Sequence, residues 1–333
     1  MVFCYETVSM TDNYLGNYLG LDAGGTSTRA VVVSSDGRCG GIGKAGSGNP
    51  TSAGIDAATA AIRDAVTQAV TSSKAGTVAG AALAVAGAGD PGHRAAIVAA
   101  LSDLVAVEPV FDFDVLAAYF SGTAAPDGYV LLSGTGASAV RVEDGRLAGI
   151  SDGLGWLLGD VGSGFWLGRE VVRAGLAPLD GRGAATLLTG LLLDRLGTMQ
   201  DERPQGGRTG TLVAATAALY AMPPLRLADF ASLVFTAAGA GDEVAAGILD
   251  QAAAGLAETL AAVRTPDVEG PLVAAGSVLA RQPDFAARVA PGAVVATDGL
   301  AGAAVLALRH AGALVDDAVY RRVTSSLAQL TEV

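Results

Sequence analysis

Residues 18–29 read YLGLDAGGTSTR, a short apolar run that ends in an aspartate and is followed by a turn rich in glycine. The β-branched run Thr28–Val33 comes next, and Asp36-Gly37 marks a tight turn before the stretch over residues 38–43. An Asp-Gly pair between two such runs is a strong hairpin signal. The segment therefore predicts a three-stranded antiparallel meander with a glycine-rich first turn.

The same order of features returns later in the chain. Residues 129–133 read YVLLS, a Gly-Thr-Gly turn follows, and the run over residues 137–142 leads to Asp144-Gly145. Beyond each meander, apolar strands alternate with helices, as in the strand expected over 271–275 and the helix over 300–310, which favours parallel pairing. Two unrelated Asp-Gly hairpins are the alternative, since such hairpins are common. The internal repeat nevertheless predicts two related α/β domains.

Length and composition fit this arrangement and exclude several classes of function. The chain has 333 residues, of which 51% are hydrophobic and 16% charged, which suits two globular domains. Its formal net charge of −12, with no basic run, argues against nucleic-acid and membrane-surface partners. No apolar stretch has the length of a membrane helix, and the first residues do not read as a signal peptide. Two cysteines and two histidines are too few for a disulfide framework or a zinc site. We expect a cytoplasmic protein.

Three apolar strands end in polar turns that contain glycine. Glycine lets a backbone approach phosphate oxygens, and its exposed N–H groups form an anion-binding nest. A single turn of this kind is more often a plain hairpin, but three in this order are typical of nucleotide binding between two domains. The candidate phosphate- and ATP-binding residues are Gly24, Gly25, Thr26, Ser27, Thr28, Arg29, Gly134, Thr135, Gly136, Gly276 and Ser277.

Phosphate charge has to be balanced without a lysine-bearing P-loop, because neither lysine has the required glycine spacing. We therefore expect Mg²⁺ as the cofactor. Asp22, at the end of the first strand, is the candidate carboxylate, which would hold the ion partly through water.

Asp114 is the candidate general base, since it ends one apolar strand and opens the next helix. A role in capping that helix is the alternative from the local sequence. Asp112 competes for the role of base, but strand alternation points it away from the face of its sequence neighbours. Residues 153–170 read GLGWLLGDVGSGFWLGRE, and sugar sites combine an aromatic surface with carboxylates. For Trp156 a sugar contact and core packing are equally supported, whereas Trp166 is expected in the core.

From residue 18 to about residue 309 the chain resembles the N-acetylglucosamine kinase and BadF-type ATPase family of the actin-like superfamily. The stretches LDAGGTSTR (21–29), LSGTG (132–136) and AAGS (274–277) resemble its two phosphate motifs and its adenosine motif. The segment from Trp156 to Gly164 resembles the most specific signature. Iron–sulfur activators related to this family need bridging cysteines, which this chain lacks. Its composition looks most like that of the actinobacterial glucosamine kinases.

The resemblance implies a duplicated actin-like (ribonuclease H-like) α/β fold with an interdomain cleft. It divides the chain into a tail (1–15), an N-terminal domain (16–122), a C-terminal domain with a helical insertion (123–312), and a C-terminal helix (313–333) that packs back on the first domain. It also implies that Asp114 is the catalytic residue, which overturns the capping interpretation. The sugar-binding residues that it implies are Asn49, Asp114, Trp156 and Asp160.

The predicted function is ATP-dependent phosphorylation of the 6-hydroxyl of D-glucosamine. The amine is favoured because Asp160 and Asp114, with Glu170 nearby, make an acidic site that attracts a cation. N-acetylglucosamine and glucose are alternative acceptors. A nucleotide-gated actin-like or chaperone-type ATPase and a non-enzymatic sugar sensor are alternatives of other classes. The expected partners are the sugar and ATP, with no nucleic acid or membrane; the oligomeric state stays open, a homodimer included.

Overall fold

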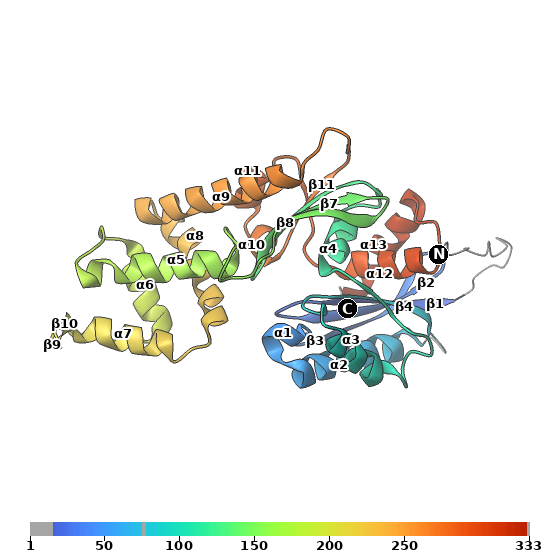
Figure 1. Ribbon diagram of the computed structural model, residues 1–333, viewed down its shortest axis with the longest axis horizontal. Helices are drawn as coiled ribbons and strands as arrows, with labels where there is room; N and C mark the ends of the chain where they lie inside the picture. The colour runs from blue at the N-terminus through green and yellow to red at the C-terminus, as the bar shows by residue number, and fades with distance from the viewer. Residues whose placement is uncertain (1–15, 75–77, 332–333) are drawn as a thin grey trace, which may run out of the picture. The chain divides into compact units, whose positions relative to one another are not determined.

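The computed structural model describes residues 16–74 and 78–331 (Figure 1). The tail predicted over residues 1–15 lies outside the described residues. The chain forms two compact units: the first contains the residues up to Ala117 and those from Leu300 onward, and the second contains Ala118–Gly299. Helix α4 (Asp114–Gly122) runs across the boundary between them. Each unit is described by itself below.

The first unit is built on a five-stranded mixed sheet. Its elements are β1 (Asn17–Ala23), β2 (Thr28–Ser34), β3 (Cys39–Ala45), α1 (Pro50–Ala53), α2 (Ile55–Ser73), β4 (Val78–Val85), α3 (Pro91–Leu101), β5 (Val110–Asp112), α12 (Leu300–His310) and α13 (Asp317–Thr331). The strand order is β3-β2-β1-β4-β5, with β1, β2 and β3 antiparallel and β4 and β5 parallel to β1. This confirms the first predicted meander.

Strand β5 is short and spans only Val110–Asp112. Pro109 has no amide to donate to the ladder and stands directly before β5. Beyond Asp112 the chain turns into α4 after one further residue, Phe113, whose side chain is exposed. The start of α4 is therefore fixed next to the carboxyl end of this strand.

Helices cover both faces of the first sheet, with α2 and α3 on one side and α12 on the other (Figure 1). Leu19 and Leu21 of β1 pack in the core together with Ile62 of α2. Gly20 faces the opposite way: a Cβ on it would lie 2.3 Å from the carbonyl oxygen of Ala303 in α12. Side chains alternate along a strand, so Asp22 shares the α12 face with Gly20.

The carboxyl-terminal helices belong to the first unit. Residues 300–312 are expected in the second domain, but α12 packs against β1, β2 and β4 of the first unit. Helix α13 lies against β3, where Ser326 Oγ accepts from the amide of Cys39 at 2.9 Å. Arg322 of the same helix donates from Nε to the carbonyl oxygen of Asp36 at 2.6 Å.

The second unit repeats the topology of the first. Its elements are β6 (Gly128–Ser133), β7 (Ala137–Glu143), β8 (Arg146–Asp152), α5 (Gly164–Leu176), η1 (Pro178–Asp180), α6 (Leu187–Leu196), β9 (Pro204–Gln205), β10 (Arg208–Thr209), α7 (Gly210–Tyr220), η2 (Pro224–Phe230), α8 (Ala231–Gly239), α9 (Glu243–Val263), β11 (Leu272–Ala275), α10 (Ser277–Arg281), α11 (Pro283–Val289) and β12 (Val294–Val295). The order β8-β7-β6-β11-β12 matches that of the first sheet, with β11 parallel to β6 and β12 parallel to β11. The duplicated α/β fold is therefore confirmed.

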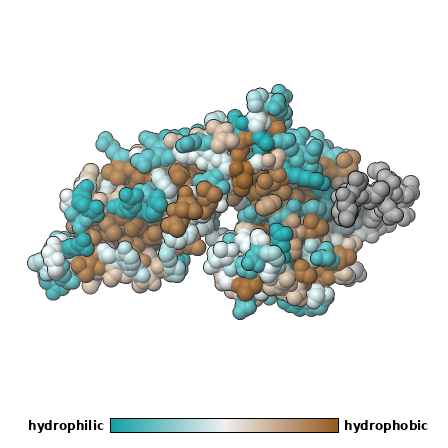
Figure 2. Space-filling model, in the orientation of Figure 1, coloured by the Kyte–Doolittle hydropathy of each residue, from teal (hydrophilic) through white to brown (hydrophobic). Residues whose placement is uncertain are grey.

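Helices α5, α8 and α9 bury the core of the second unit, to which Trp166 contributes as expected. Figure 2 shows, on the face in view, brown apolar residues over the helical region. The loop over residues 200–210 forms the small β9–β10 hairpin. Across residues 16–74 and 78–331 no single helix is long and apolar enough to span a membrane; the strongly bent pair Gly210–Tyr220 and Pro224–Gly239 passes by length and composition alone.

Candidate phosphate and sugar site

The predicted site residues fall in both units, and each set is described within its own unit. In the first unit, the turn between β1 and β2 presents free backbone amides. Gly24 N donates to the carbonyl oxygen of Ser27 at 2.9 Å and closes the turn. Within the described residues, the amides of Gly25, Thr26 and Ser27 donate no hydrogen bond. Clustered N–H groups of this kind bind anions, so this turn can hold phosphate oxygens.

Packing inside the protein does not require glycine at the tip of this turn. A Cβ on Gly24 would come no closer than 3.8 Å to a neighbouring atom, and one on Gly25 no closer than 3.9 Å. Neither residue has a positive φ. A larger side chain would therefore fit the protein itself. What glycine adds is room for another molecule to approach the backbone.

The position of the Thr28 side chain does not fit its predicted role as a phosphate ligand. Its side chain is buried, and its hydroxyl donates to the carbonyl oxygen of Gly46 at 2.8 Å, which supports the turn. Arg29 lies opposite Asp22 in the β1–β2 ladder, with Nη1 4.0 Å from Oδ2. Both of these side chains keep some exposure, 27% for Arg29 and 15% for Asp22.

Asp22 suits a magnesium ion that arrives with its nucleotide. Among the described residues, no three or more His, Cys, Asp or Glu side chains cluster as a metal site. Mg²⁺ in phosphotransfer sites needs no such cage, because it keeps several waters and takes one or two carboxylates plus the phosphates. A single partly exposed carboxylate beside a phosphate-binding turn fits that donor set.

The segment Gly46–Asn49 packs on the first turn, where Gly48 N donates to the carbonyl oxygen of Gly24 at 3.2 Å. Asn49 caps α1, because its Oδ1 accepts from the amide of Thr51 at 2.9 Å. In the part of the chain that the structure describes, Asn49 Nδ2 makes no hydrogen bond. The side chain of Asn49 therefore keeps two N–H donors for a ligand while its oxygen holds the helix.

Asp114 begins α4 and is partly buried. Burial raises the pKa of its carboxyl group above the ordinary value of 3.8, against hydrogen bonds from the amide of Val115 and from its own amide. The side chain thus also satisfies amides at the helix start, so capping and a role as base do not exclude each other. A carboxylate with a raised pKa accepts a proton more readily, as a general base must.

Asp112 lies in the same sheet as Asp22 and in register with it. Asp22 pairs with Ala84 of β4, and Ala84 pairs with Asp112 of β5. Two strand spacings separate the aspartates by about 10 Å. Asp112 Oδ2 is 2.5 Å from Nε2 of His310 on α12, so this carboxylate is engaged by a helix of its own unit.

In the second unit, the turn between β6 and β7 is held against the start of α5. The amide of Gly164 donates to the carbonyl oxygen of Gly134 at 2.7 Å, and that of Phe165 donates to Thr135 O at 3.2 Å. The turn closes through Gly134 N and Gly136 O at 2.9 Å. Among the described residues, the amides of Thr135 and Gly136 donate no hydrogen bond, as in the first turn.

Gly276 brings the third turn against the second. It has a φ of +92°, and a Cβ there would lie 2.4 Å from the carbonyl carbon and oxygen of Ser133. Only glycine therefore allows the end of β11 to reach this position. The Cα of Gly276 and the amide nitrogen of Ser277 lie 3.7 Å from a Cβ placed on Gly134. The two predicted motifs of this unit thus form one surface.

Asp160 lies directly beside the second turn and is buried, with 5% of its surface exposed. Its Oδ1 accepts from the amide of Ala137 at 3.0 Å, and its Oδ2 would lie 3.1 Å from a Cβ on Gly136. Burial raises the pKa of Asp160 above 3.8, and the negative charge of Asp152 adds to that shift. The carboxylate therefore faces the glycine turn, where a larger residue than glycine would crowd it.

Trp156 stands on the loop before Asp160 and is 37% exposed. Its ring packs at a tilt against Phe165 of α5, with the centroids 5.3 Å apart. Both interpretations from the sequence thus apply in part, since one side of the ring is packed and another remains open. Glu170 on α5 is paired with Arg169 at 2.9 Å and with Arg173 at 3.1 Å, so its charge is balanced.

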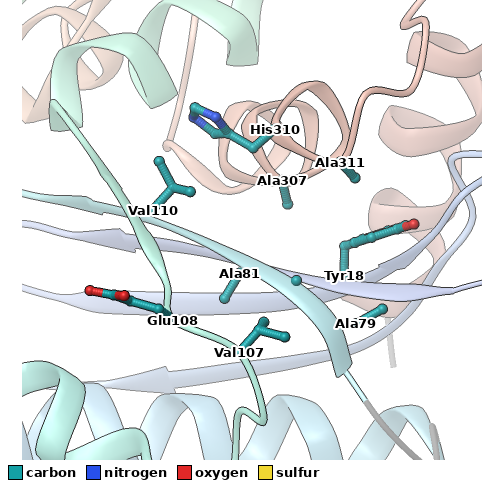
Figure 3. Close-up of a pocket in the computed structure, with 10 residues that line it drawn as sticks. Tyr18, Ala79, Ala81, Val107, Glu108, Val110, Ala307, His310 and Ala311 are labelled. Carbon is teal, nitrogen blue, oxygen red and sulfur yellow. The ribbon is translucent and has the colours of Figure 1, made fainter. Parts of the chain in front are cut away.

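The first unit also contains a pocket of about 420 Å³ (Figure 3). It lies at the end of the sheet opposite to the one where Asp22 lies. Tyr18 at the start of β1, Ala81 of β4 and Val110 of β5 line it together with Ala307 and His310 of α12. The described residues that line it include none of the predicted site residues. The pocket is thus separate from the carboxyl end of the sheet, where Asp22 and the start of α4 lie.

Sequence reasoning missed one residue of the second unit, Asp152. Its Oδ1 accepts from the amide of Asp160 at 2.9 Å, and both residues have positive φ values, +59° and +61°. In the sequence, Asp152-Gly153 reads as one more tight turn. The sequence signal that could have identified Asp152 is the presence of two aspartates, Asp152 and Asp160, at the ends of a glycine-rich loop.

The chain is 29% identical over 197 residues to N-acetyl-D-glucosamine kinase of Dictyostelium discoideum, across 56% of this chain and 62% of that protein. It is 41% identical over 71 residues to N-acetylmuramic acid/N-acetylglucosamine kinase of Clostridium acetobutylicum, across 21% of this chain and 23% of that protein. The chain therefore matches less than two thirds of the length of these curated relatives.

The fold matches over a longer range. The crystal structure of a candidate N-acetylglucosamine kinase from Chromobacterium violaceum superposes with a TM-score of 0.69 at 25% identity, covering 88% of this chain and 99% of that one. The fold is accordingly that of the actin-like sugar kinases. The family model for BadF/BadG/BcrA/BcrD ATPases matches residues 19–289. This match spans both units and most of the chain, and the chain belongs to the BadF/BadG/BcrA/BcrD ATPase family.

Proposed function

We propose that this protein is an ATP-dependent kinase that phosphorylates the 6-hydroxyl of an amino sugar. Membership in an ATPase family supports the nucleotide, and the relatives named as N-acetylglucosamine kinases support the sugar. The observation that carries the proposal is the pair of glycine turns, one in each unit, whose amides are free within the described residues. Free amides in such turns can bind phosphate oxygens, whereas they form no hydrogen bond that stabilises the fold.

In this proposal the phosphates of ATP lie on the turns at Gly24–Ser27 and Gly134–Gly136. Their free amides donate to phosphate oxygens, and Arg29 adds a positive charge. Gly276 and Ser277 lie on the adenosine side. Thr28 supports the first turn from below, because its hydroxyl is already used by Gly46.

Asp114 acts as the general base. Its carboxylate takes the proton of the sugar 6-hydroxyl while the hydroxyl oxygen forms a bond to the γ-phosphorus. The bond between that phosphorus and the β,γ-bridging oxygen breaks, and ADP leaves. The raised pKa of Asp114 favours this role, since the base must hold the proton as transfer proceeds.

Mg²⁺ bound with ATP would neutralise charge on the transferring phosphoryl group. We propose Asp22 as the carboxylate of this chain that holds it. Arg29, with Nη1 4.0 Å from Oδ2 of Asp22, helps to orient that carboxylate. The proposal needs only one protein carboxylate, in line with the preference of this ion for water and phosphate oxygens.

The sugar would be bound by Asn49, Trp156 and Asp160. Asn49 offers two N–H donors to hydroxyl oxygens, Asp160 accepts from hydroxyl or ammonium groups, and the open side of Trp156 covers an apolar face of the ring. These three groups differ in chemistry and do not duplicate one another. That combination is what recognition of a polar ring requires.

D-Glucosamine is the proposed acceptor because its ammonium group is attracted to Asp160 and Asp114. The negative charge of Asp152 beside Asp160 strengthens this argument, while Glu170 contributes little because two arginines balance it. N-acetylglucosamine is the second candidate, favoured by the names of the relatives.

The two acceptors are separated by measuring kcat/KM for glucosamine, N-acetylglucosamine and glucose side by side at low and high salt. Glucosamine should be preferred, and added salt should narrow its lead because screening weakens the attraction. The product should be identified by phosphorus NMR as the 6-phosphate. A preference for N-acetylglucosamine that is insensitive to salt would assign the acetylated sugar and refute the charge argument.

A further inference from the structure

The loop over residues 152–160 is closed by a side chain. Asp152 Oδ1 accepts from the amide of Asp160 at 2.9 Å and, more weakly, from the amide of Leu154 at 3.4 Å. A Cβ on Gly159 would lie 2.1 Å from the same oxygen, so only glycine leaves room for this closure. The carboxylate of Asp152 thus joins the two ends of the loop.

Both ends of the loop are also tied to one residue of β7. The amide of Gly153 donates to the carbonyl oxygen of Ala137 at 2.9 Å, while the amide of Ala137 donates to Asp160 Oδ1 at 3.0 Å. Asp160 is held at a φ of +61°, a left-handed conformation that few residues other than glycine adopt. Backbone and side chain of Asp160 are therefore both set by contacts outside the residue itself.

We infer that Asp152 is a positioning residue for sugar binding, which holds the Asp160 carboxylate in the orientation that faces the glycine turn. The inference rests on the proposed function, in which Asp160 binds the sugar. Asp152 need not touch the substrate: it accepts from the part-buried amide of Asp160 and so fixes where the neighbouring carboxylate points. Removal of the acceptor from a part-buried amide is more costly than replacement by an equivalent acceptor.

Asp152 also acts on Asp160 through its charge. Within the described residues, it is the one charged side chain whose field shifts the pKa of Asp160, and it raises it. Charged groups on the flanking elements are paired or exposed. They are Arg141 with Glu143 on β7, Arg146 on β8, Arg169 and Arg173 with Glu170 on α5, Asp250 with Arg288, and Glu243 and Glu258 on α9.

The test compares D152A with D152N. Alanine removes the acceptor, whereas asparagine keeps an oxygen acceptor, tolerates a positive φ and removes the charge. D144A is the matched control, because Asp144 also has a positive φ (+49°) but lies in the exposed β7–β8 hairpin. It therefore carries a comparable backbone penalty without touching the loop. Glucosamine and N-acetylglucosamine are both used as acceptors.

D152A should lower kcat/KM for the preferred sugar by roughly 10- to 100-fold, mostly through KM, while KM for ATP changes little. D144A should stay near wild type. D152N should recover most of the activity that D152A loses. Its sugar binding, measured by calorimetry, should be lost at a lower pH than in wild type, because a charge that raises the pKa of Asp160 is gone.

Equal kcat/KM for D152A and wild type would overturn the inference. It would also be overturned if kcat/KM fell equally in D152A and D152N, or equally in D152A and D144A. If D152A does not fold, sugar binding by D152N that is lost at the same pH as in wild type overturns it instead. D160N separates the two proposals. A fully active D160N would refute the sugar site itself, whereas an impaired D160N with an unimpaired D152A would refute only the role of Asp152.

Discussion

His310 on α12 and Asp112 on β5 form a side-chain pair, with Nε2 2.5 Å from Oδ2. Two aspartates near the end of β5 were candidates for the base, and this contact distinguishes them. Asp112 is engaged by a helix that covers the sheet, whereas Asp114 begins the next helix with a raised pKa. The proposed roles are therefore structural for Asp112 and catalytic for Asp114.

The first prediction compares D114N with D112N. Asparagine at position 114 keeps the shape of the side chain but cannot take the proton, so kcat should fall by roughly 10²–10⁴. Sugar binding, measured by calorimetry, should survive in D114N. D112N is the matched control two residues away, and it should keep kcat within a few-fold. The opposite ranking of the two variants would make Asp112 the base.

The second prediction concerns pH. Burial raises the pKa of Asp114, and the base must be ionised to work, so kcat/KM should fall as the pH drops through a value above the ordinary 3.8. A raised pKa means that activity is lost earlier on acidification than for an exposed aspartate. The pH profile measured in constant ionic strength tests this. An acid limb at or below pH 3.8 would contradict a buried base.

The third prediction concerns the metal. Chelation of Mg²⁺ should abolish transfer, because no lysine stands in the phosphate motifs to balance the charge. D22N should raise the Mg²⁺ concentration needed for half-maximal rate, while D56N, in the exposed first turn of α2, serves as the control with unchanged metal dependence. Full activity in excess chelator would refute the metal, and a normal Mg²⁺ titration of D22N would refute Asp22 as its ligand.

The fourth prediction concerns stability of the first unit. In G20A the new Cβ would lie 2.3 Å from the backbone oxygen of Ala303, so β1 and α12 must separate. We expect a loss of about 2 kcal/mol or more in the free energy of unfolding. G89A, in an exposed turn with no atom within 4 Å of its Cβ, should change it by less than about 0.5 kcal/mol.

These two variants are best followed by urea unfolding with circular dichroism. Trp156 and Trp166 both lie in the second unit, so tryptophan fluorescence reports that unit alone. G20A should therefore shift the dichroism transition more than the fluorescence transition. Equal stability of G20A and G89A would mean that α12 does not pack on β1 as closely as the structure has it.

The parts of the fold that follow from local signals can be predicted from the sequence. Asp36-Gly37 and Asp144-Gly145 specify hairpins between neighbouring strands, and the structure confirms both. The place of α12 cannot be predicted this way. Its packing on Gly20 joins residues almost the whole chain apart, and nothing in residues 300–310 says which sheet they cover.

In the candidate site, too, local sequence signals predict some features and miss others. Glycine turns can be recognised because glycine next to hydroxyl residues is a local pattern. Thr28 shares that pattern, yet its hydroxyl is turned inward to Gly46. Asp152 escapes sequence reasoning because its partner is a backbone amide, that of Asp160, and because the contact depends on two positive φ values. The two aspartates around the glycine-rich loop mark a turn in the sequence, but they do not show which backbone amide Asp152 contacts.

The proposed function of this chain is transfer of the γ-phosphoryl group of ATP to a sugar. Its most direct test is to measure ADP and sugar 6-phosphate together, with glucosamine, with N-acetylglucosamine and without a sugar, in wild type and D114N. We predict that a sugar stimulates ADP formation, that the two products appear in equal amounts, and that D114N loses both. ADP formation at the same rate with and without sugars, and with no sugar phosphate, would contradict the claim and assign a nucleotide-gated ATPase instead.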